Sequence, residues 1–354
     1  MCRSITAAFV LFLTPTWAAA QIVTGSGAGA GGHVRVFDGQ TGDAALNFFP
    51  YSPSFSGGVR VAAGDVNGDG TADVIAGTGP ASGAGGGPHV KVFDGRTGIE
   101  LRSFFAYGVA ESDGVFVSAG DINGDSIFDI VAGTDVGTAA HVKVFDGQTG
   151  LETGSFNPYG ASFTGGVRVA TGDLNSDGLA DIITGAGPGG GPHVKVFDGQ
   201  TGNELRSFLA YPATFSGGIF VASGDIDGDG FADIITGTDD GAAGHVKVFD
   251  GQTGSELRSF LPYGTFAGGV RVAAGDLNGD GWAVIVTGAG PGGGPHVKVF
   301  DGQSGVELRS FFAYDAGFTG GVYVAAVPEP SSVLILASSL ALLSPWRRRG
   351  QERR

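Results

Sequence analysis

The sequence predicts an all-β protein, a six-bladed β-propeller of four-stranded antiparallel blades closed by pairing of its N-terminal and C-terminal strands. The first observation is a phrase, His-Val-Lys-Val-Phe-Asp-Gly with one Arg in place of Lys, that occurs six times. The second is its period of 51 to 56 residues, which suits one blade. The third is that the chain begins and ends with parts of one unit. The phrase starts at His33, His89, His141, His193, His245 and His296.

One complete unit shows the expected elements in order. Residues 166–170 (Gly-Val-Arg-Val-Ala) read as a first strand, residues 173–181 as a loop and residues 182–185 as a second strand. A loop rich in Gly and Pro leads to a third strand at 193–198, and a Gly-Gln-Thr-Gly turn leads to a fourth at 204–211. Connections this short join antiparallel neighbours, so the unit is one four-stranded sheet.

The chain ends indicate how the ring closes. Residues 22–25 resemble the second strand of a unit, and residues 321–325 resemble the first. Five complete units and one split unit therefore make six sheets, and pairing the two ends hides strand edges that would otherwise be exposed. A calcium-binding β-helix of nonapeptide repeats is excluded, because its period is far shorter.

Residues 1–20 are typical of a secretory signal, with one Arg, an apolar run and Ala-Ala-Ala before Gln21. The alternative is a buried N-terminal helix. The only cysteine, Cys2, lies in this segment, so the exported chain has no disulfide and needs another means of stabilisation. The sequence thus divides into a signal at 1–20, a propeller at 21–327 and a tail at 328–354.

The tail combines a short motif, an apolar stretch and an arginine cluster. The motif is Val327, Pro328, Glu329 and Pro330. This order resembles the PEP-CTERM sorting signal of bacterial surface proteins. The resemblance implies processing by an exosortase, a short or transient membrane anchor and an association with extracellular polysaccharide. A plain tail anchor is the alternative, although the apolar stretch is short for a spanning helix.

Aspartate-rich loops between the first and second strands carry the strongest chemistry. Oxygen ligands at loop positions 1, 3, 5 and 9, with the backbone carbonyl of position 7, suit a hard cation, so calcium is favoured over zinc or copper. An Asx turn without metal is the alternative. Four loops have the full set: Asp65, Asn67, Asp69, Thr71 and Asp73; Asp121, Asn123, Asp125, Ile127 and Asp129; Asp173, Asn175, Asp177, Leu179 and Asp181; Asp225, Asp227, Asp229, Phe231 and Asp233.

Two loops depart from the pattern. Ser126 replaces the glycine that permits the tight bend, so we expect strain there. Val284 replaces the last aspartate of the fifth loop, which retains Asp276, Asn278 and Asp280. We therefore expect about four bound calcium ions and a weak or empty fifth site.

These loops, each between two strands, and the Gly-Ala-Gly-Pro segments at 185–188 and 288–291 resemble FG-GAP repeats of integrin α-subunit propellers and the related VCBS repeats of bacterial surface proteins. The resemblance covers about residues 21–326. It implies a propeller whose loop aspartates and asparagines bind calcium on one face. The Phe-Gly signature occurs only as variants, and integrins have seven blades.

One position of the first strand alternates between basic and aromatic residues around the ring. If first strands line the centre, these side chains circle the channel. Two interpretations remain open: the arginines pair with Asp135 or Asp239 of neighbouring blades as structural ties, or the ring binds a ligand, with the aromatic residues stacking on a sugar. The residues are Arg60, Phe116, Arg168, Phe220, Arg271 and Tyr323.

Nothing in the pattern indicates catalysis. The six histidines occupy one repeat position and should lie too far apart to share a zinc ion, so we expect them to pack or to form hydrogen bonds. No nucleophile stands outside the repeat. The net charge of −15 repels nucleic acid.

We therefore predict that this chain is not an enzyme but a calcium-binding scaffold or adhesion module of the cell surface or extracellular matrix. Its partner is extracellular polysaccharide or a surface protein. A lectin-like propeller and a polysaccharide-active enzyme are the alternatives.

Overall fold

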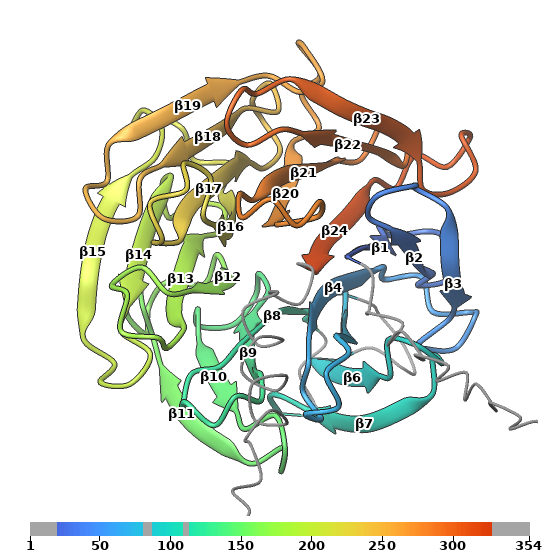
Figure 1. The fold of residues 1–354 in the computed structure, drawn as a ribbon, viewed down its shortest axis with the longest axis horizontal. Coiled ribbons are helices and arrows are strands. Elements are labelled where there is room, and N and C mark those ends of the chain that lie inside the picture. The colour runs from blue at the N-terminus through green and yellow to red at the C-terminus, as the bar shows by residue number, and fades with distance from the viewer. Residues whose placement is uncertain (1–19, 81–86, 109–112, 328–354) are drawn as a thin grey trace, which may run out of the picture.

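Six four-stranded antiparallel sheets surround a central channel in the computed structural model, which describes residues 20–80, 87–108 and 113–327 (Figure 1). The predicted fold class is thus confirmed. Within these ranges there is no helix of the length and hydropathy that a membrane crossing requires. The proposed signal, apart from Ala20, and the motif residues Pro328, Glu329 and Pro330 lie outside the described residues.

Each blade runs from an innermost first strand to an outermost fourth strand. Blade 1 comprises β24 (Val322–Val327), β1 (Gln21–Ser26), β2 (Val34–Asp38) and β3 (Ala44–Phe48). Blade 2 comprises β4 (Val59–Gly64), β5 (Asp73–Thr78), β6 (His89–Phe93) and β7 (Glu100–Phe105). Blade 3 comprises β8 (Val115–Gly120), β9 (Asp129–Thr134), β10 (Val142–Phe145) and β11 (Glu152–Phe156).

The remaining blades repeat this order. Blade 4 comprises β12 (Val167–Gly172), β13 (Asp181–Ala186), β14 (His193–Phe197) and β15 (Glu204–Leu209). Blade 5 comprises β16 (Ile219–Gly224), β17 (Asp233–Thr238), β18 (Val246–Phe249) and β19 (Glu256–Phe260). Blade 6 comprises β20 (Val270–Gly275), β21 (Val284–Ala289), β22 (His296–Phe300) and β23 (Glu307–Phe312).

Blade 1 closes the ring, because its first strand comes from the C-terminal end and its other strands from the N-terminal end. β24 pairs with β1 in the register Gln21 to Val327 and Ser26 to Val322. Arg309 of blade 6 also binds the backbone carbonyls of Gly39 and Gln40 in blade 1. The predicted pairing of the two ends is therefore confirmed, and no blade has an unpaired inner strand.

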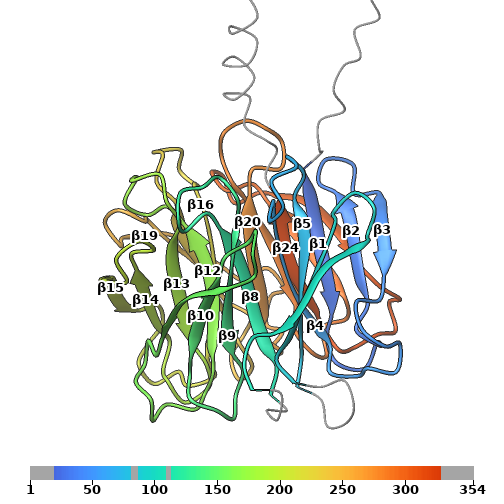
Figure 2. The same ribbon diagram turned by 90° about the horizontal axis from the view of Figure 1, so that it is seen from below.

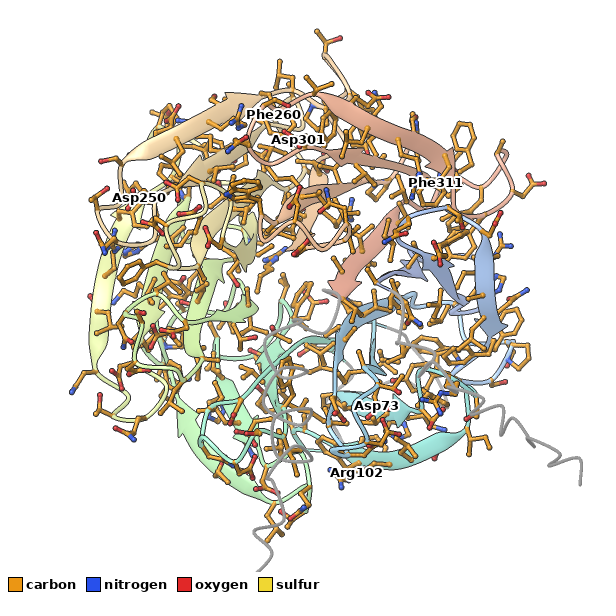
Figure 3. All side chains as sticks on the ribbon, viewed as in Figure 1. Asp73, Arg102, Asp250, Phe260, Asp301 and Phe311 are labelled. Atoms are coloured by element: carbon orange, nitrogen blue, oxygen red, sulfur yellow. The ribbon has the colours of Figure 1, made fainter. Side chains whose placement is uncertain are left out.

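The core lies between neighbouring blades. Second strands such as β5 and β13 are buried at every residue, as expected for strands covered on both faces, whereas fourth strands expose every other residue. A pair of Phe rings lies at each of the six joints, with ring centroids 4.8 to 5.0 Å apart. Phe311 of blade 6 contacts Phe37 of blade 1 in this way (Figure 3).

A tyrosine also bridges each joint. Its hydroxyl group lies within hydrogen-bond distance of the carbonyl oxygen of the repeat histidine in the next blade. Burial raises the pKa of five of these phenols, those of Tyr51, Tyr159, Tyr211, Tyr263 and Tyr314, so their hydroxyl groups keep the proton and donate. The bridging residues are Tyr51, Tyr107, Tyr159, Tyr211, Tyr263 and Tyr314.

Antiparallel order separates the connecting loops into two faces. Loops between first and second strands, which contain the aspartates, lie on one face, and the described ends at Ala20 and Val327 lie there too (Figure 2). Loops between second and third strands, and connections between blades, lie on the opposite face. We call these the aspartate face and the glycine face.

Candidate metal sites and the central ring

The aspartate loops are tight bends that need left-handed backbone at positions 4 and 6. In the loop of blade 2 these are Gly68 and Gly70, with φ of 76° and 80°. Two serines adopt this conformation elsewhere, Ser126 at φ 68° and Ser176 at φ 59°. The expected strain at Ser126 therefore has a physical basis, because a Cβ atom disfavours left-handed backbone. The requirement at position 4 was missed in the sequence, although the glycines there show it.

Polar side chains of the blade 2 loop turn inward onto its own backbone. The Asp65 carboxylate accepts hydrogen bonds from the N–H groups of Gly68 (2.7 Å) and Gly70 (2.8 Å). Asn67 Oδ1 accepts from Asp69 N–H (2.8 Å), and Asp69 Oδ1 accepts from Thr71 N–H (2.8 Å). The loop thus holds the oxygen atoms of positions 1, 3 and 5 on its concave side.

The aspartate at position 9 is the first residue of the second strand and is buried. Asp73 is fully buried and accepts a hydrogen bond from Val66 N–H. Burial, together with the charges of Asp69 and Asp65, raises the pKa of the Asp73 carboxyl to about 7. Burial likewise raises the pKa of Asp181 and Asp233 to about 6, and it raises that of Asp129. An anionic group at this position therefore lacks compensating charge from the protein.

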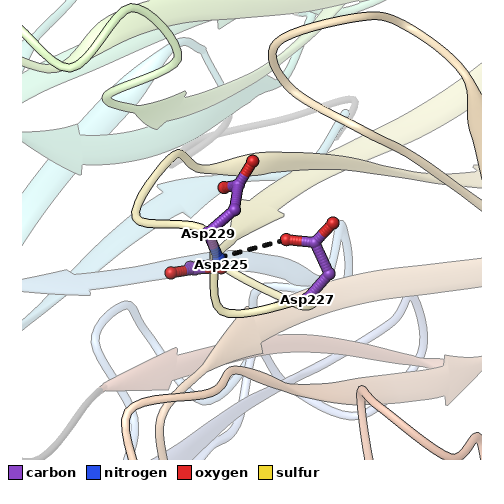
Figure 4. A group of neighbouring side chains, drawn as sticks. All are labelled: Asp225, Asp227 and Asp229. Carbon is purple, nitrogen blue, oxygen red and sulfur yellow. Dashed lines mark hydrogen bonds between the residues drawn. The ribbon is translucent and has the colours of Figure 1, made fainter.

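In blade 5, three carboxylates of one loop converge. Oxygen atoms of Asp225, Asp227 and Asp229 lie within 4.8 Å of one another, and the Asp229 N–H donates to Asp227 (Figure 4). Burial and the neighbouring Asp229 charge raise the pKa of Asp227. The other three complete loops have asparagine at position 3, so they contain one carboxylate fewer.

The fifth loop keeps the bend but not the buried acid. Asp276 accepts from Gly279 N–H (2.7 Å) and Gly281 N–H (2.9 Å), as Asp65 does in blade 2. Val284 occupies position 9 and is buried in an apolar cluster. The backbone hydrogen bonds thus preserve the shape of this loop, but it has one oxygen ligand fewer than a complete loop.

Side chains at position 7 link neighbouring loops. Ile127 lies against Gly68 of the preceding blade, and Leu179 lies against Gly124. Trp282 covers Gly228 in the same way. The apolar residues at this position, which were predicted to contribute a backbone carbonyl, therefore also pack one loop on the next around the aspartate face.

On the glycine face, six side chains alternate around the channel. Each guanidinium carbon of Arg60, Arg168 and Arg271 lies 4.7 to 5.4 Å from the centroids of two aromatic rings. Phe116 and Phe220 are buried between these arginines. These six side chains and the first strands line an open cavity of about 160 Å³. Phe116 and Phe220 are each contacted by two guanidinium groups, whereas Tyr323 is partly exposed.

Two of the three arginines pair with an aspartate of the next blade. Arg60 of blade 2 binds Asp135 of blade 3, and Arg168 of blade 4 binds Asp239 of blade 5 at 2.5 Å. Burial lowers the pKa of Arg60, but the charge and hydrogen bond of Asp135 together with the charges of Tyr323 and Asp239 outweigh it, so the pKa is raised overall. Arg271 forms no salt bridge among the described residues.

The repeat histidines form hydrogen bonds within their own blades. Nε2 of His193 lies 2.8 Å from the Ser207 hydroxyl group on the adjacent strand, and four other histidines bond to the equivalent serine. In blade 1 the partner of His33 is Asn47. They do not converge on one point, as expected from their repeat spacing.

Comparisons with known proteins agree with this architecture. Residues 225–287 match the model of the FG-GAP-like repeat, and residues 165–203 match that of the FG-GAP repeat. Among solved structures, a protein of unknown function from Bacteroides caccae is 13% identical with a TM-score of 0.53, over 87% of this chain and 99% of that one. At this identity the likeness concerns the fold alone.

Two further structures are less similar. Sqt1 of Saccharomyces cerevisiae is 12% identical with a TM-score of 0.46, over 87% of this chain and 81% of that one. The exotype rhamnogalacturonan lyase YesX is 16% identical with a TM-score of 0.41. That match covers 83% of this chain and 56% of the lyase, so the chain spans just over half the length of that enzyme. The chain thus contains FG-GAP repeats, and they are built into a six-bladed β-propeller.

Proposed function

We propose that this protein is an exported, calcium-stabilised propeller that serves as a non-catalytic binding or scaffold module at the cell surface or in the extracellular matrix. The observation that carries the calcium proposal is the buried aspartate at position 9 of four loops. In three of these loops it accepts a hydrogen bond from the asparagine at position 3, and in blade 5 the carboxylates of positions 1, 3 and 5 converge. A propeller without disulfides would thereby gain a cross-link between first and second strands.

The donor set fits calcium. Calcium takes six to eight oxygen ligands with flexible geometry, and each complete loop offers carboxylates, an amide or a further carboxylate, and a backbone carbonyl. Burial disfavours the charged form of Asp73 and its equivalents, and a bound divalent cation supplies the missing positive charge. Calcium would therefore contribute stability mainly in blades 2, 3, 4 and 5.

The binding proposal concerns the glycine face. The described chain ends at Val327 on the aspartate face, so an anchor that follows it would hold that face toward the membrane and present the glycine face outward. Loops on the glycine face differ most between blades, as is common for binding surfaces. Export by the signal at 1–20, processing of the tail by an exosortase and binding of polysaccharide or a surface protein complete the proposal.

The test is thermal unfolding of residues 21–327, within which the ring closes on itself, with calcium and with a chelator. We expect a large upward shift of the unfolding midpoint with calcium, and calorimetry should count about four ions per chain. Asp229→Ala should reduce both the shift and the count. The matched control is Asp280→Ala in the incomplete loop, which should change neither. An unchanged unfolding midpoint in the parent protein would show that the aspartate loops are turns that calcium does not stabilise.

A further inference from the structure

One arginine of the central ring lacks the partner that its two equivalents have. Arg60 and Arg168 each bind a carboxylate through Nη2. Arg271 stands at the same position of β20, is as deeply buried, with 6% of its surface exposed, and stacks between Phe220 and Tyr323. Its Nε and Nη1 atoms are buried without a hydrogen-bond partner, as are those of Arg168, so the two arginines differ in the carboxylate that Arg168 binds through Nη2.

The missing carboxylate follows from the sequence of blade 1. Asp135 and Asp239 are the first residues after a second strand, and each donates its backbone N–H to the residue before the facing first strand, Gly114 or Gly218. In blade 1 the equivalent residue is Gly27, which donates to Gly321. A Cβ atom at Gly27 would collide with the carbonyl oxygen of Gly320, so this joint does not accommodate an aspartate.

We propose that Arg271 is an anion site that binds the carboxylate group of an external ligand at the joint between blades 6 and 1. A buried guanidinium without a counter-ion is costly, and a bidentate or charge-assisted bond to a carboxylate offsets that cost. Carboxylate is the favoured anion because two equivalent joints of this ring already hold one beside the same arginine and aromatic pair.

Two sources share this chemistry, a small free carboxylate and the acid group of a sugar. The proposal deepens the binding role proposed above by naming its ligand class, and it rests on the ring rather than on the calcium loops. Ligand recognition is thereby assigned to a single joint between two blades. The aromatic side chains of the ring stack on the guanidinium group and not on the ligand.

The test follows the arginine Nε–H signals of the full chain by NMR during titration at constant ionic strength. The probes are sodium acetate, sodium glucuronate and neutral methyl glucoside. We expect the Arg271 signal to shift and saturate with a carboxylate, while the signals of Arg60 and Arg168 stay in place. A response to acetate alone identifies a small-acid site, and a response to both acids identifies an acidic-sugar site.

Variants separate the site from general effects. Arg271→Met should abolish the line broadening that the bound protein causes in the acetate NMR signal. The control Arg206→Met, on the outermost strand of blade 4 and away from this joint, should retain it. Asp239→Ala frees Arg168, so a second signal should begin to respond; Asp135→Ala does the same for Arg60 if the first variant does not fold. A static Arg271 signal, or an equal response to chloride, would overturn the proposal. Calcium stoichiometry should be the same in Arg271→Met, so failure here is distinct from failure of the calcium proposal.

Discussion

The hydroxyl group of Tyr314 lies 3.0 Å from the carbonyl oxygen of Thr24, which is 290 positions away in the chain. It also lies 2.8 Å from the carbonyl oxygen of His33. This tyrosine therefore joins the last complete blade to the blade that contains the N-terminal strands. The same bridge at the other five joints shows that closure uses the ordinary contact between blades rather than a special one.

Tyr314→Phe should destabilise the closed ring. The substitution keeps the aromatic ring but removes the one hydroxyl donor that the carbonyl oxygens of Thr24 and His33 share. Because the His33 oxygen still accepts from Ser26 N–H, the expected cost is that of one hydrogen bond, about 0.5 to 1.5 kcal/mol. Urea unfolding of residues 21–327 measures the change. Tyr323→Phe is the control, because the Tyr323 hydroxyl group forms no hydrogen bond across a joint among the described residues and the substitution keeps its ring contacts. Equal losses in both variants would contradict the bridging role of Tyr314.

Val284→Asp should complete the fifth calcium site. The backbone N–H groups that bond Asp233 belong to residues seven before and eighteen after it, and in blade 6 these are Leu277 and Gly302. We expect one additional bound calcium ion by calorimetry. In chelator the variant should be less stable than the parent by about 1 to 3 kcal/mol, because a carboxyl group replaces a buried isopropyl group. An unchanged ion count would show that position 9 does not complete the site.

Ser126→Gly should raise stability slightly. Left-handed backbone costs an L-residue about 1 to 2 kcal/mol, and glycine avoids this cost. The greater freedom of glycine in the unfolded chain offsets about 0.5 to 1 kcal/mol of that stabilisation. The expected net gain is thus about 1 kcal/mol or less. Thermal unfolding in chelator measures it. Ser126→Ala keeps the Cβ atom and should give no such gain, so a similar effect of both variants would rule out relief of backbone strain.

Four repeat histidines should titrate below the ordinary value of 6.5. Burial lowers the pKa of His89, His193, His245 and His296, and the neighbouring lysines lower it further. Because the unfolded state binds protons more readily, the contribution of these imidazoles is present above pH 6.5 and is lost as pH falls through their lowered pKa values. NMR titration of the ring signals tests this directly, and values at or above 6.5 would contradict it.

Much of the fold was predictable because the sequence pattern of one blade occurs six times. Glycines at fixed turn positions, strands of four to six residues and a period of 51 to 56 residues are local features, and they leave few arrangements other than a ring. The split unit determined that the ends pair, since residues 22–25 and 321–325 are complementary strand types. The positions of the loop aspartates followed from the same spacing.

Other features depend on neighbours that are distant in sequence, and only the tertiary structure decided them. The tyrosine bridges, the Phe pairs and the packing of Trp282 over Gly228 each join different blades, so no local pattern reveals them. The ring is the clearest case. The alternation of residue types in the sequence predicted that arginines and aromatic residues share the central ring. The sequence left open whether the arginines bind aspartates or the ring binds a ligand. The fold pairs Arg60 and Arg168 with aspartates and leaves Arg271 without one, because at its joint, between residues from opposite ends of the chain, Gly27 occupies the equivalent position.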